Sequence, residues 1–95
     1  MFGIEERVYN NLLKYFRESS YIKRVLIFGS RAKGSYKYNS DIDLGILCEK
    51  SYRGIIVEEI DEIIGVYSCD IVFLDNMNEE IKLQIDRDGI EIYNG

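Results

Sequence analysis

Two aspartates at the start of an apolar segment constrain this chain more than any other feature. Asp41 and Asp43 flank Ile42, and the segment stays apolar as far as Cys48. Alternate residues of a strand point to one face, so these carboxylates would lie about 7 Å apart at their Cα atoms and share one space. A buried or half-buried carboxylate needs a compensating partner. A divalent cation is the simplest partner for two acidic side chains on one face.

The size and the N-terminal residues of the chain point to one domain in the cytoplasm. Its 95 residues suit a single small core, so we expect one domain spanning residues 1–95. No segment is long and apolar enough to cross a membrane. The opening residues MFGIEERVY carry acids and lack the apolar region of a secretory signal. We therefore expect a cytoplasmic protein that does not contact membranes.

The absence of histidine limits the possible chemistry. It excludes Ser-His and Cys-His nucleophilic catalysis, histidine acid-base catalysis and most zinc sites. Cys48 and Cys69 do not have metal-ligand spacing, and we expect them to be small buried residues in a reducing compartment. Catalysis would therefore depend on carboxylates, hydroxyls, Lys or Arg, and bound ions.

Charge is distributed unevenly along the chain. The net charge of -5 argues against general nucleic-acid binding. Residues 41–95 carry fourteen acids and four bases, whereas residues 19–40 carry five bases and no acid. This basic segment is either a solvated loop or the binding site of an anion smaller than a duplex.

Hydrophobic periodicity predicts helices and strands in alternation. Apolar residues at helical spacing or in short β-branched runs, together with candidate caps at Ser30, Ser51 and Asn78 and a stop at Gly89, define the elements. The expected order is helix 4–18, strand 22–28, short helix 30–36, strand 42–48, helix 52–66, strand 69–74, a helix after residue 78 and edge strand 90–93. This order predicts an α/β protein with a small sheet and flanking helices.

The turn at Gly29-Ser30 is a candidate phosphate site. A buried strand that turns directly into a helix presents free backbone N–H groups, and glycine allows a ligand to approach closely. Arg31 and Lys33 follow in the expected first helical turn, where cations oppose the helix dipole unless an anion binds there. A plain turn with a capping serine would explain Gly29-Ser30 equally well.

A third carboxylate can complete a metal site. Asp70 is the acid within the apolar segment CDIVFL, and Cys69 must then point to the opposite face. If this strand neighbours strand 42–48, Asp70 lies near Asp41 and Asp43; otherwise it is a turn residue at the start of a strand. Oxygen ligands of this kind suit Mg²⁺ or Mn²⁺. Two such ions support in-line phosphoryl transfer.

Taken together, these residues resemble a known signature. Gly29-Ser30, ten further residues and Asp41-Ile42-Asp43 match the GSx10DxD pattern of the minimal nucleotidyltransferases of the DNA polymerase β superfamily. The resemblance extends over essentially the whole chain. It implies the polymerase β-type nucleotidyltransferase fold, a metal triad of Asp41, Asp43 and Asp70, ATP and two Mg²⁺ ions. It also implies triphosphate contacts at Gly29-Ser30, with Arg31 and Lys33 at basic positions typical of the family.

The resemblance further implies a partner protein. Minimal members typically pair with a helical HEPN-type toxin, an RNase, and act as the antitoxin by transferring AMP from ATP to a tyrosine hydroxyl of the toxin. An enzyme of this kind, in a hetero-oligomer with the toxin, is the expected function. Two alternatives stay open: an antitoxin that acts by occlusion without catalysis, and nucleotidyl transfer to a small molecule or an RNA end with the help of a partner subunit.

Overall fold

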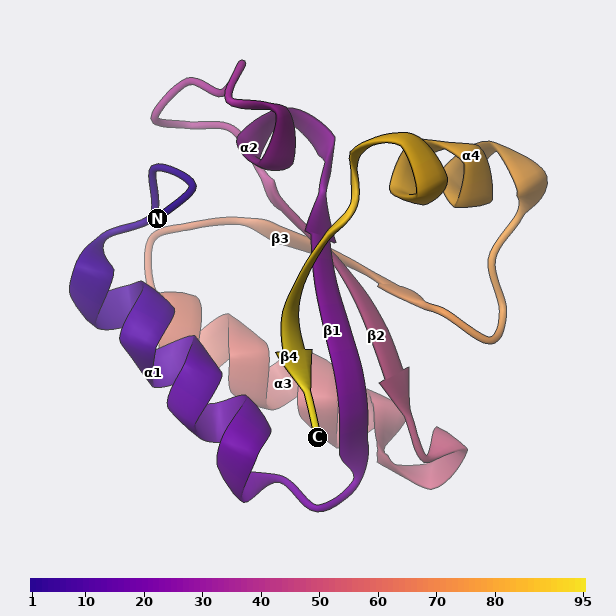
Figure 1. Cartoon of the computed structure of the whole chain (residues 1–95). Coiled ribbons are helices and arrows are strands. Elements are labelled where there is room, and N and C mark those ends of the chain that lie inside the picture. Colours follow the sequence, from indigo (N-terminus) through magenta and orange to yellow (C-terminus); the bar gives the residue numbers. More distant parts are fainter.

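One four-stranded mixed sheet organises the computed structural model, which describes residues 1–95 (Figure 1). The strand order is β3-β2-β1-β4. In chain order the elements are α1 (Glu6–Glu18), β1 (Ile22–Phe28), α2 (Gly29–Lys33), β2 (Ile42–Cys48), the 3-10 turn η1 (Lys50–Tyr52), α3 (Arg53–Ile64), β3 (Cys69–Phe73), α4 (Glu79–Asp88) and β4 (Ile90–Asn94). The predicted mixed α/β fold, with a small sheet and flanking helices, is confirmed.

The connections explain the mixed sheet. The central strand β1 pairs antiparallel with β2 on one side and with β4 on the other. After β2 the chain crosses over through α3 and returns as β3, which is parallel to β2. The ends of β1 and the starts of β2 and β3 therefore meet at one border of the sheet. As predicted, β4 is an edge strand.

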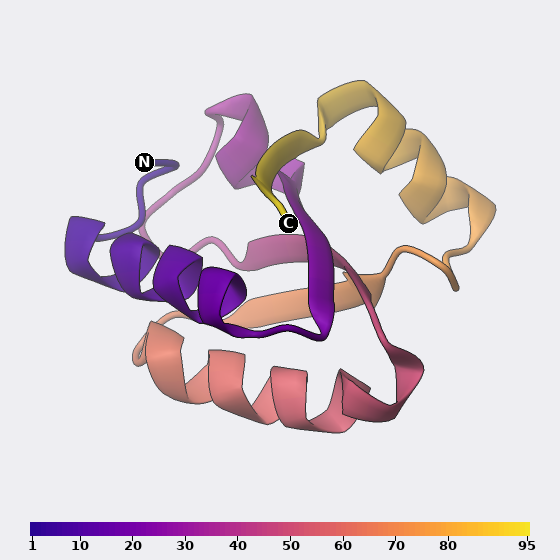
Figure 2. The ribbon, with the colours of Figure 1, turned by 60° about the horizontal axis from the view of Figure 1, so that its bottom comes forward.

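The main core lies between one face of the sheet and the helices α1 and α3. Figure 2 shows these two helices next to each other, with α1 at the left and α3 at the bottom of the view. Their apolar stripes bury Leu12, Phe16, Ile56, Ile60 and Ile64 against inward-facing side chains of β1 and β2. Burial of several such side chains, each contributing about 1.5 to 3 kcal/mol, holds this layer together. None of the helices has the length and apolar content of a membrane span.

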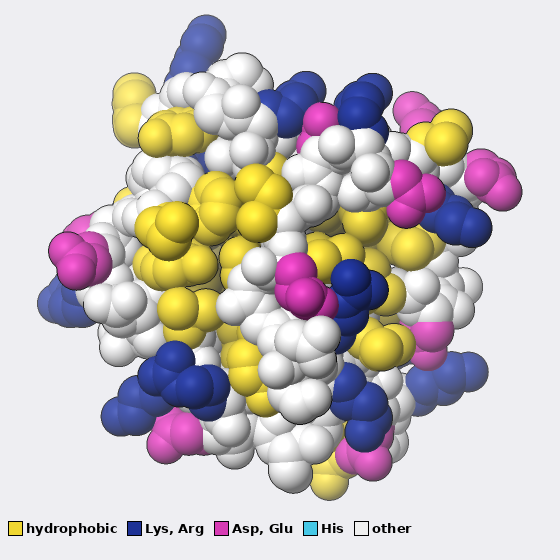
Figure 3. Space-filling model, viewed as in Figure 1, with side chains coloured by type: hydrophobic (Ala, Val, Ile, Leu, Met, Phe, Trp, Pro, Cys, Tyr) yellow, Lys and Arg dark blue, Asp and Glu magenta, His cyan; other side chains and the backbone are white.

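The opposite face of the sheet is covered less completely. There α4 packs Ile85 on Leu26 and Phe28, which form a second small cluster. Gly45 leaves room for this contact, because a Cβ at that position would press on the Leu74 side chain. Apolar side chains remain visible beside α4 in Figure 3, and acidic and basic side chains alternate around the rim of this view.

Helix starts and caps differ from the expected ones in three places, and α3 ends at Ile64 rather than at residue 66. Phe2 and Gly3 have positive φ angles of 58° and 69°, so the first helix begins at Glu6 rather than at Ile4. The predicted cap at Ser30 is wrong, because α2 begins at Gly29 and ends at the left-handed Gly34. The predicted cap at Ser51 is also wrong, since this residue lies inside η1.

The cap of α4 was predicted correctly. The Asn78 side chain accepts a hydrogen bond of 2.8 Å from the Ile81 N–H, and the helix stops at Gly89. We expect Asn78→Ala to lower the free energy of unfolding by about 1 kcal/mol, because an N–H of the first turn loses its acceptor. Urea titration should measure this loss, and Asn76→Ala is the control because the Asn76 side chain is exposed outside the helix. Equal stability of the two variants would contradict the role of the cap.

Candidate active site

The three predicted aspartates lie at the sheet border where β1 ends and β2 and β3 begin. Asp43 is paired with Asp70 in the parallel register of β2 and β3, so their side chains stand side by side on one face. In the antiparallel register Asp43 is paired with Phe28, the last residue of β1. Asp41 lies exposed just before β2. The predicted neighbourhood of the strands that carry Asp43 and Asp70 is therefore confirmed.

The charges of these carboxylates are not compensated within the chain. The pKa of Asp43 is raised to about 6, mainly by burial and to a lesser degree by the negative charges of Asp70 and Asp41. None of the three forms a salt bridge. The side chains do not form a ready-made three-ligand cluster in this structure. Their oxygen donors and uncompensated charge nevertheless fit a hard divalent cation such as Mg²⁺ or Mn²⁺.

Gly29, at the start of α2, lies directly against the Asp43 carboxylate. Its φ of +74° is strained for other residues, and a Cβ at this position would overlap the Asp43 carboxylate. The absence of a side chain thus lets Asp43 lie directly against the β1–α2 junction. Ser30 follows in the first turn, where backbone N–H groups lack partners within the helix. Because α2 has only five residues, these N–H groups matter more for an anion than the helix dipole does.

Arg31 does not lie where the sequence predicted a nucleotide contact. The residue is only 1% exposed. The guanidinium donates four hydrogen bonds to the carbonyl oxygens of Phe2, Tyr38 and Ser40. Donors that are satisfied in this way inside the protein are not available to a phosphate. Sequence reasoning missed this role because Phe2 is far away along the chain.

Lys33, unlike Arg31, is not enclosed by the protein. Its side chain is exposed at the end of α2. The pKa of Asp88 is lowered mainly by a hydrogen bond from Arg87 and to a lesser degree by the charge of Lys33, which places Lys33 near α4. Both Arg31 and Lys33 belong to the last turn of α2, so the expected conflict with the helix dipole does not arise.

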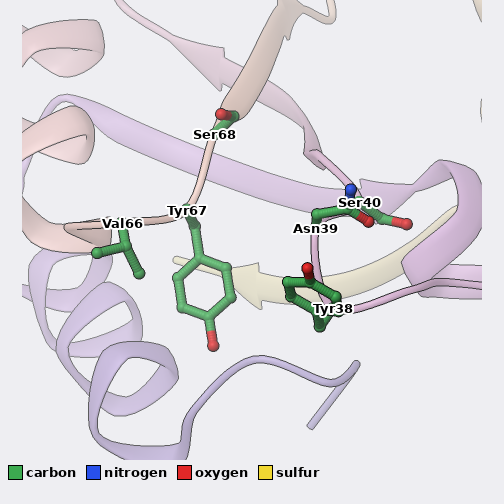
Figure 4. Close-up of a pocket in the computed structure, with 6 residues that line it drawn as sticks. All are labelled: Tyr38, Asn39, Ser40, Val66, Tyr67 and Ser68. Atoms are coloured by element: carbon green, nitrogen blue, oxygen red, sulfur yellow. The ribbon is translucent and has the colours of Figure 1, made fainter.

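A cavity of about 410 Å³ lies between two segments that each precede a strand carrying an aspartate (Figure 4). One wall is the segment that leads into β2, and the other is the segment that leads into β3. The lining residues are Tyr38, Asn39, Ser40, Val66, Tyr67 and Ser68. Tyr38 and Val66 are 90% and 99% exposed at its mouth. Sequence analysis did not single out these residues; the available signal was that each segment immediately precedes a strand carrying an aspartate.

Residues 10–95 match the family model described as Polymerase beta, Nucleotidyltransferase. The chain belongs to this nucleotidyltransferase family. The match includes Gly29-Ser30 and all three aspartates. Members of the family typically use divalent metal ions. No curated protein sequence matches this chain.

Solved structures share the fold of this nucleotidyltransferase. A chain of a toxin-antitoxin complex with AMP-PNP superposes with a TM-score of 0.70 at 20% identity, covering 97% of this chain and 75% of that one. The toxin-antitoxin MntA-HepT gives 0.67 at 18% identity, with 96% and 74% covered. A complex of tri-AMPylated Shewanella oneidensis HEPN toxin with MNT antitoxin gives 0.66 at 17% identity, with 93% and 71% covered. At such identities the similarity establishes a common architecture.

Proposed function

We propose that this chain is a Mg²⁺-dependent adenylyltransferase that transfers AMP from ATP to a tyrosine hydroxyl of a HEPN-type toxin, and thereby acts as its antitoxin in a cytoplasmic hetero-oligomer. The pairing of Asp43 with Asp70 directly beside the Gly29-Ser30 turn carries this proposal. Family membership supports nucleotidyl transfer. The shared fold with antitoxin complexes, one with AMP-PNP and one with an AMPylated toxin, supports ATP as donor and the toxin as acceptor.

The donor would be held at the β1–α2 junction. Free N–H groups at Gly29-Ser30 would bind the β- and γ-phosphates, and the missing side chain of Gly29 would allow the phosphates to approach the backbone. The exposed ammonium of Lys33 would add charge at longer range. Asp41, Asp43 and Asp70 would hold two Mg²⁺ ions, with Mn²⁺ as a possible substitute. When bound, such ions neutralise charge on the phosphates and lower the pKa of an attacking hydroxyl.

The acceptor would approach from the β3 side, where Asp70 is exposed. Asp70 would orient the tyrosine hydroxyl and accept its proton. The phenolic oxygen then forms a bond to the α-phosphorus, and the bond from the α-phosphorus to the oxygen bridging to the β-phosphorus breaks. Pyrophosphate leaves at the opposite side, toward Gly29-Ser30, which is the in-line arrangement that the positions of these groups favour.

Transfer of the α-phosphate label tests the proposal directly. The protein should be incubated with α-labelled ATP, Mg²⁺ and the helical protein encoded by the adjacent reading frame. We expect label on a tyrosine of that protein, and Asp41→Asn should lower the labelling rate by roughly 10²-fold or more, because it removes one charge from the site. Asp61→Asn makes the same chemical change on the exposed surface of α3 and should leave labelling unchanged.

The alternatives predict different outcomes. Occlusion without catalysis is favoured by the acidic residues 41–95, with fourteen acids against four bases, which could cover a basic RNase surface. In that case the toxin stays unlabelled and Asp41→Asn still neutralises it. Label on an RNA end or a small molecule, rather than on the protein, would support transfer to those acceptors. Unchanged labelling by Asp41→Asn would contradict the assigned site.

A further inference from the structure

We infer that Arg31 is a positioning residue of this site: its guanidinium fastens α2 to the two segments that lead into β2 and β3, and so sets where Asp41 and Asp70 stand relative to Gly29-Ser30. The inference rests on the proposed function. It concerns a buried side chain that touches neither ATP nor the acceptor. Its basis is the set of contacts that surround one fully enclosed guanidinium.

The segment that leads into β2 is held by three of these contacts. Nε and Nη2 of Arg31 donate to the Ser40 carbonyl at 3.1 and 2.9 Å, and Nη2 also donates to the Tyr38 carbonyl at 3.2 Å. Ser40 is the residue immediately before Asp41. A fork of two donors on one carbonyl fixes the direction of that carbonyl as well as its distance. The backbone that enters Asp41 is therefore tied to α2.

Two further segments close around the same group. The guanidinium carbon lies 5.4 Å from the ring centre of Tyr36 and 5.3 Å from that of Tyr67, the second of which belongs to the segment leading into β3. Nη1 donates to the Phe2 carbonyl at 3.0 Å, and the Tyr67 hydroxyl accepts a 2.9 Å bond from the Glu5 N–H. The N-terminal residues 1–5 thus cover the guanidinium from outside.

The charge of Arg31 has an unusual partner set. Arg31 is 1% exposed, yet it forms no salt bridge. Three carbonyl oxygens and two ring faces replace a carboxylate. Burial of a cation without such contacts costs free energy, so loss of any of these carbonyl or ring contacts should destabilise the buried guanidinium. Lysine keeps the charge but cannot form the fork or the planar stacking.

These contacts link the proposed phosphate site with the proposed metal ligands. Arg31 follows Gly29-Ser30 in α2, whereas Asp41 and Asp70 lie shortly after Ser40 and Tyr67. Loss of the guanidinium would free both lead-in segments, which also form the two walls of the cavity in Figure 4. The aspartates would then bind a divalent ion less well, even though every carboxylate is still present.

Binding of Mn²⁺ alone, followed by electron paramagnetic resonance of the free ion, tests this inference without requiring turnover. Groups that orient metal ligands typically contribute 10- to 100-fold in affinity, so Arg31→Lys should weaken Mn²⁺ binding by about tenfold or more. Tyr36→Leu removes one ring at a partly exposed position and should weaken binding less, in the same direction. Leu12→Ala destabilises the core below the opposite sheet face and should leave Mn²⁺ binding unchanged at temperatures where every variant is folded.

Steady-state labelling gives a second readout. Arg31→Lys should raise the Mg²⁺ concentration needed for half-maximal rate and lower kcat, with a smaller effect on the KM for ATP. Wild-type Mn²⁺ affinity in Arg31→Lys, or equal weakening by Leu12→Ala, would overturn the inference. If the wild-type protein labels no acceptor but Arg31→Lys still weakens Mn²⁺ binding, the proposed function fails while the positioning role stands.

Discussion

Replacing Asp43 by asparagine should stop AMP transfer and, at the same time, make the metal-free protein more stable. The carboxylate is half-buried, stands beside Asp70 and has no cation partner in the chain. Its removal would eliminate one of the proposed metal ligands, for which we expect a loss of activity of about 10²-fold or more. The same change removes the repulsion and the desolvation that raise the pKa of Asp43. A loss of activity accompanied by a gain in stability would show that Asp43 acts in the site and does not stabilise the fold.

The pH dependence of stability tests independently whether the Asp43 carboxylate destabilises the metal-free protein. The pKa of Asp43 is raised from 3.8 to about 6 in the folded protein, so the folded state holds this proton more tightly than the unfolded chain does. The contribution of Asp43 to the free energy of unfolding is therefore most favourable below about pH 4, falls as the pH rises to about 6 and stays low above it. Relative to Asp43→Asn, the wild type should lose about 1 kcal/mol over this window, a value reduced for solvent screening of a half-exposed group.

Thermal unfolding in EDTA between pH 3.5 and pH 8 would measure this difference. Asp61→Asn on the surface of α3 serves as the matched control and should follow the wild-type curve. Addition of Mg²⁺ at pH 7.5 should raise the Tm of the wild type and should change that of Asp43→Asn much less. A wild-type protein that is more stable than Asp43→Asn in EDTA at neutral pH would refute the interpretation of the aspartates as an uncompensated cluster.

Gly29→Ala should have the other large effect. The residue has a φ of +74°, which costs an L-residue about 1 to 2 kcal/mol, and the added Cβ would also displace the Asp43 carboxylate. We therefore expect lower stability together with a nearly complete loss of labelling. The activity loss would follow from the moved carboxylate and from a side chain at the proposed phosphate site.

Gly34→Ala separates these two causes. Gly34 has a comparable φ of +83°, but a Cβ there meets no atom within 4 Å. It should lose similar stability in urea titrations and retain most of its labelling activity. If Gly29→Ala and Gly34→Ala lose activity to the same extent, backbone strain in α2 alone explains the result, and the contact between Gly29 and Asp43 has no special role.

The sequence was informative where local pattern determines structure. Short apolar runs and, for the last strand, alternation located every strand to within about a residue. Asp70 was expected beside Asp43 on the condition that its strand neighbours strand 42–48, and the parallel pairing of β2 and β3 meets this condition. The capping role of Asn78 also depends only on adjacent residues. The strand positions and this cap need no knowledge of distant contacts.

Arg31 shows why the remainder could not be predicted. Its position next to Gly29-Ser30 and its charge both suggested a phosphate contact. Its actual partners include Phe2 and Tyr67, which are distant in sequence and are brought together only by the packing of α1 and β3. The start of the first helix was misplaced for a related reason: residues 1–5 bend toward the Arg31 guanidinium instead of continuing the helical pattern.

The position of β3 as an edge strand of the sheet has a consequence for the size of acceptor that can reach Asp70. Asp70 is on the outermost strand, and no other strand of the chain lies beyond it. An acceptor hydroxyl does not have to be threaded into a closed pocket to reach such a group. It can be presented on the surface of another folded macromolecule, and that surface would then cover the open side of the active site. A very small domain can therefore modify a target larger than itself.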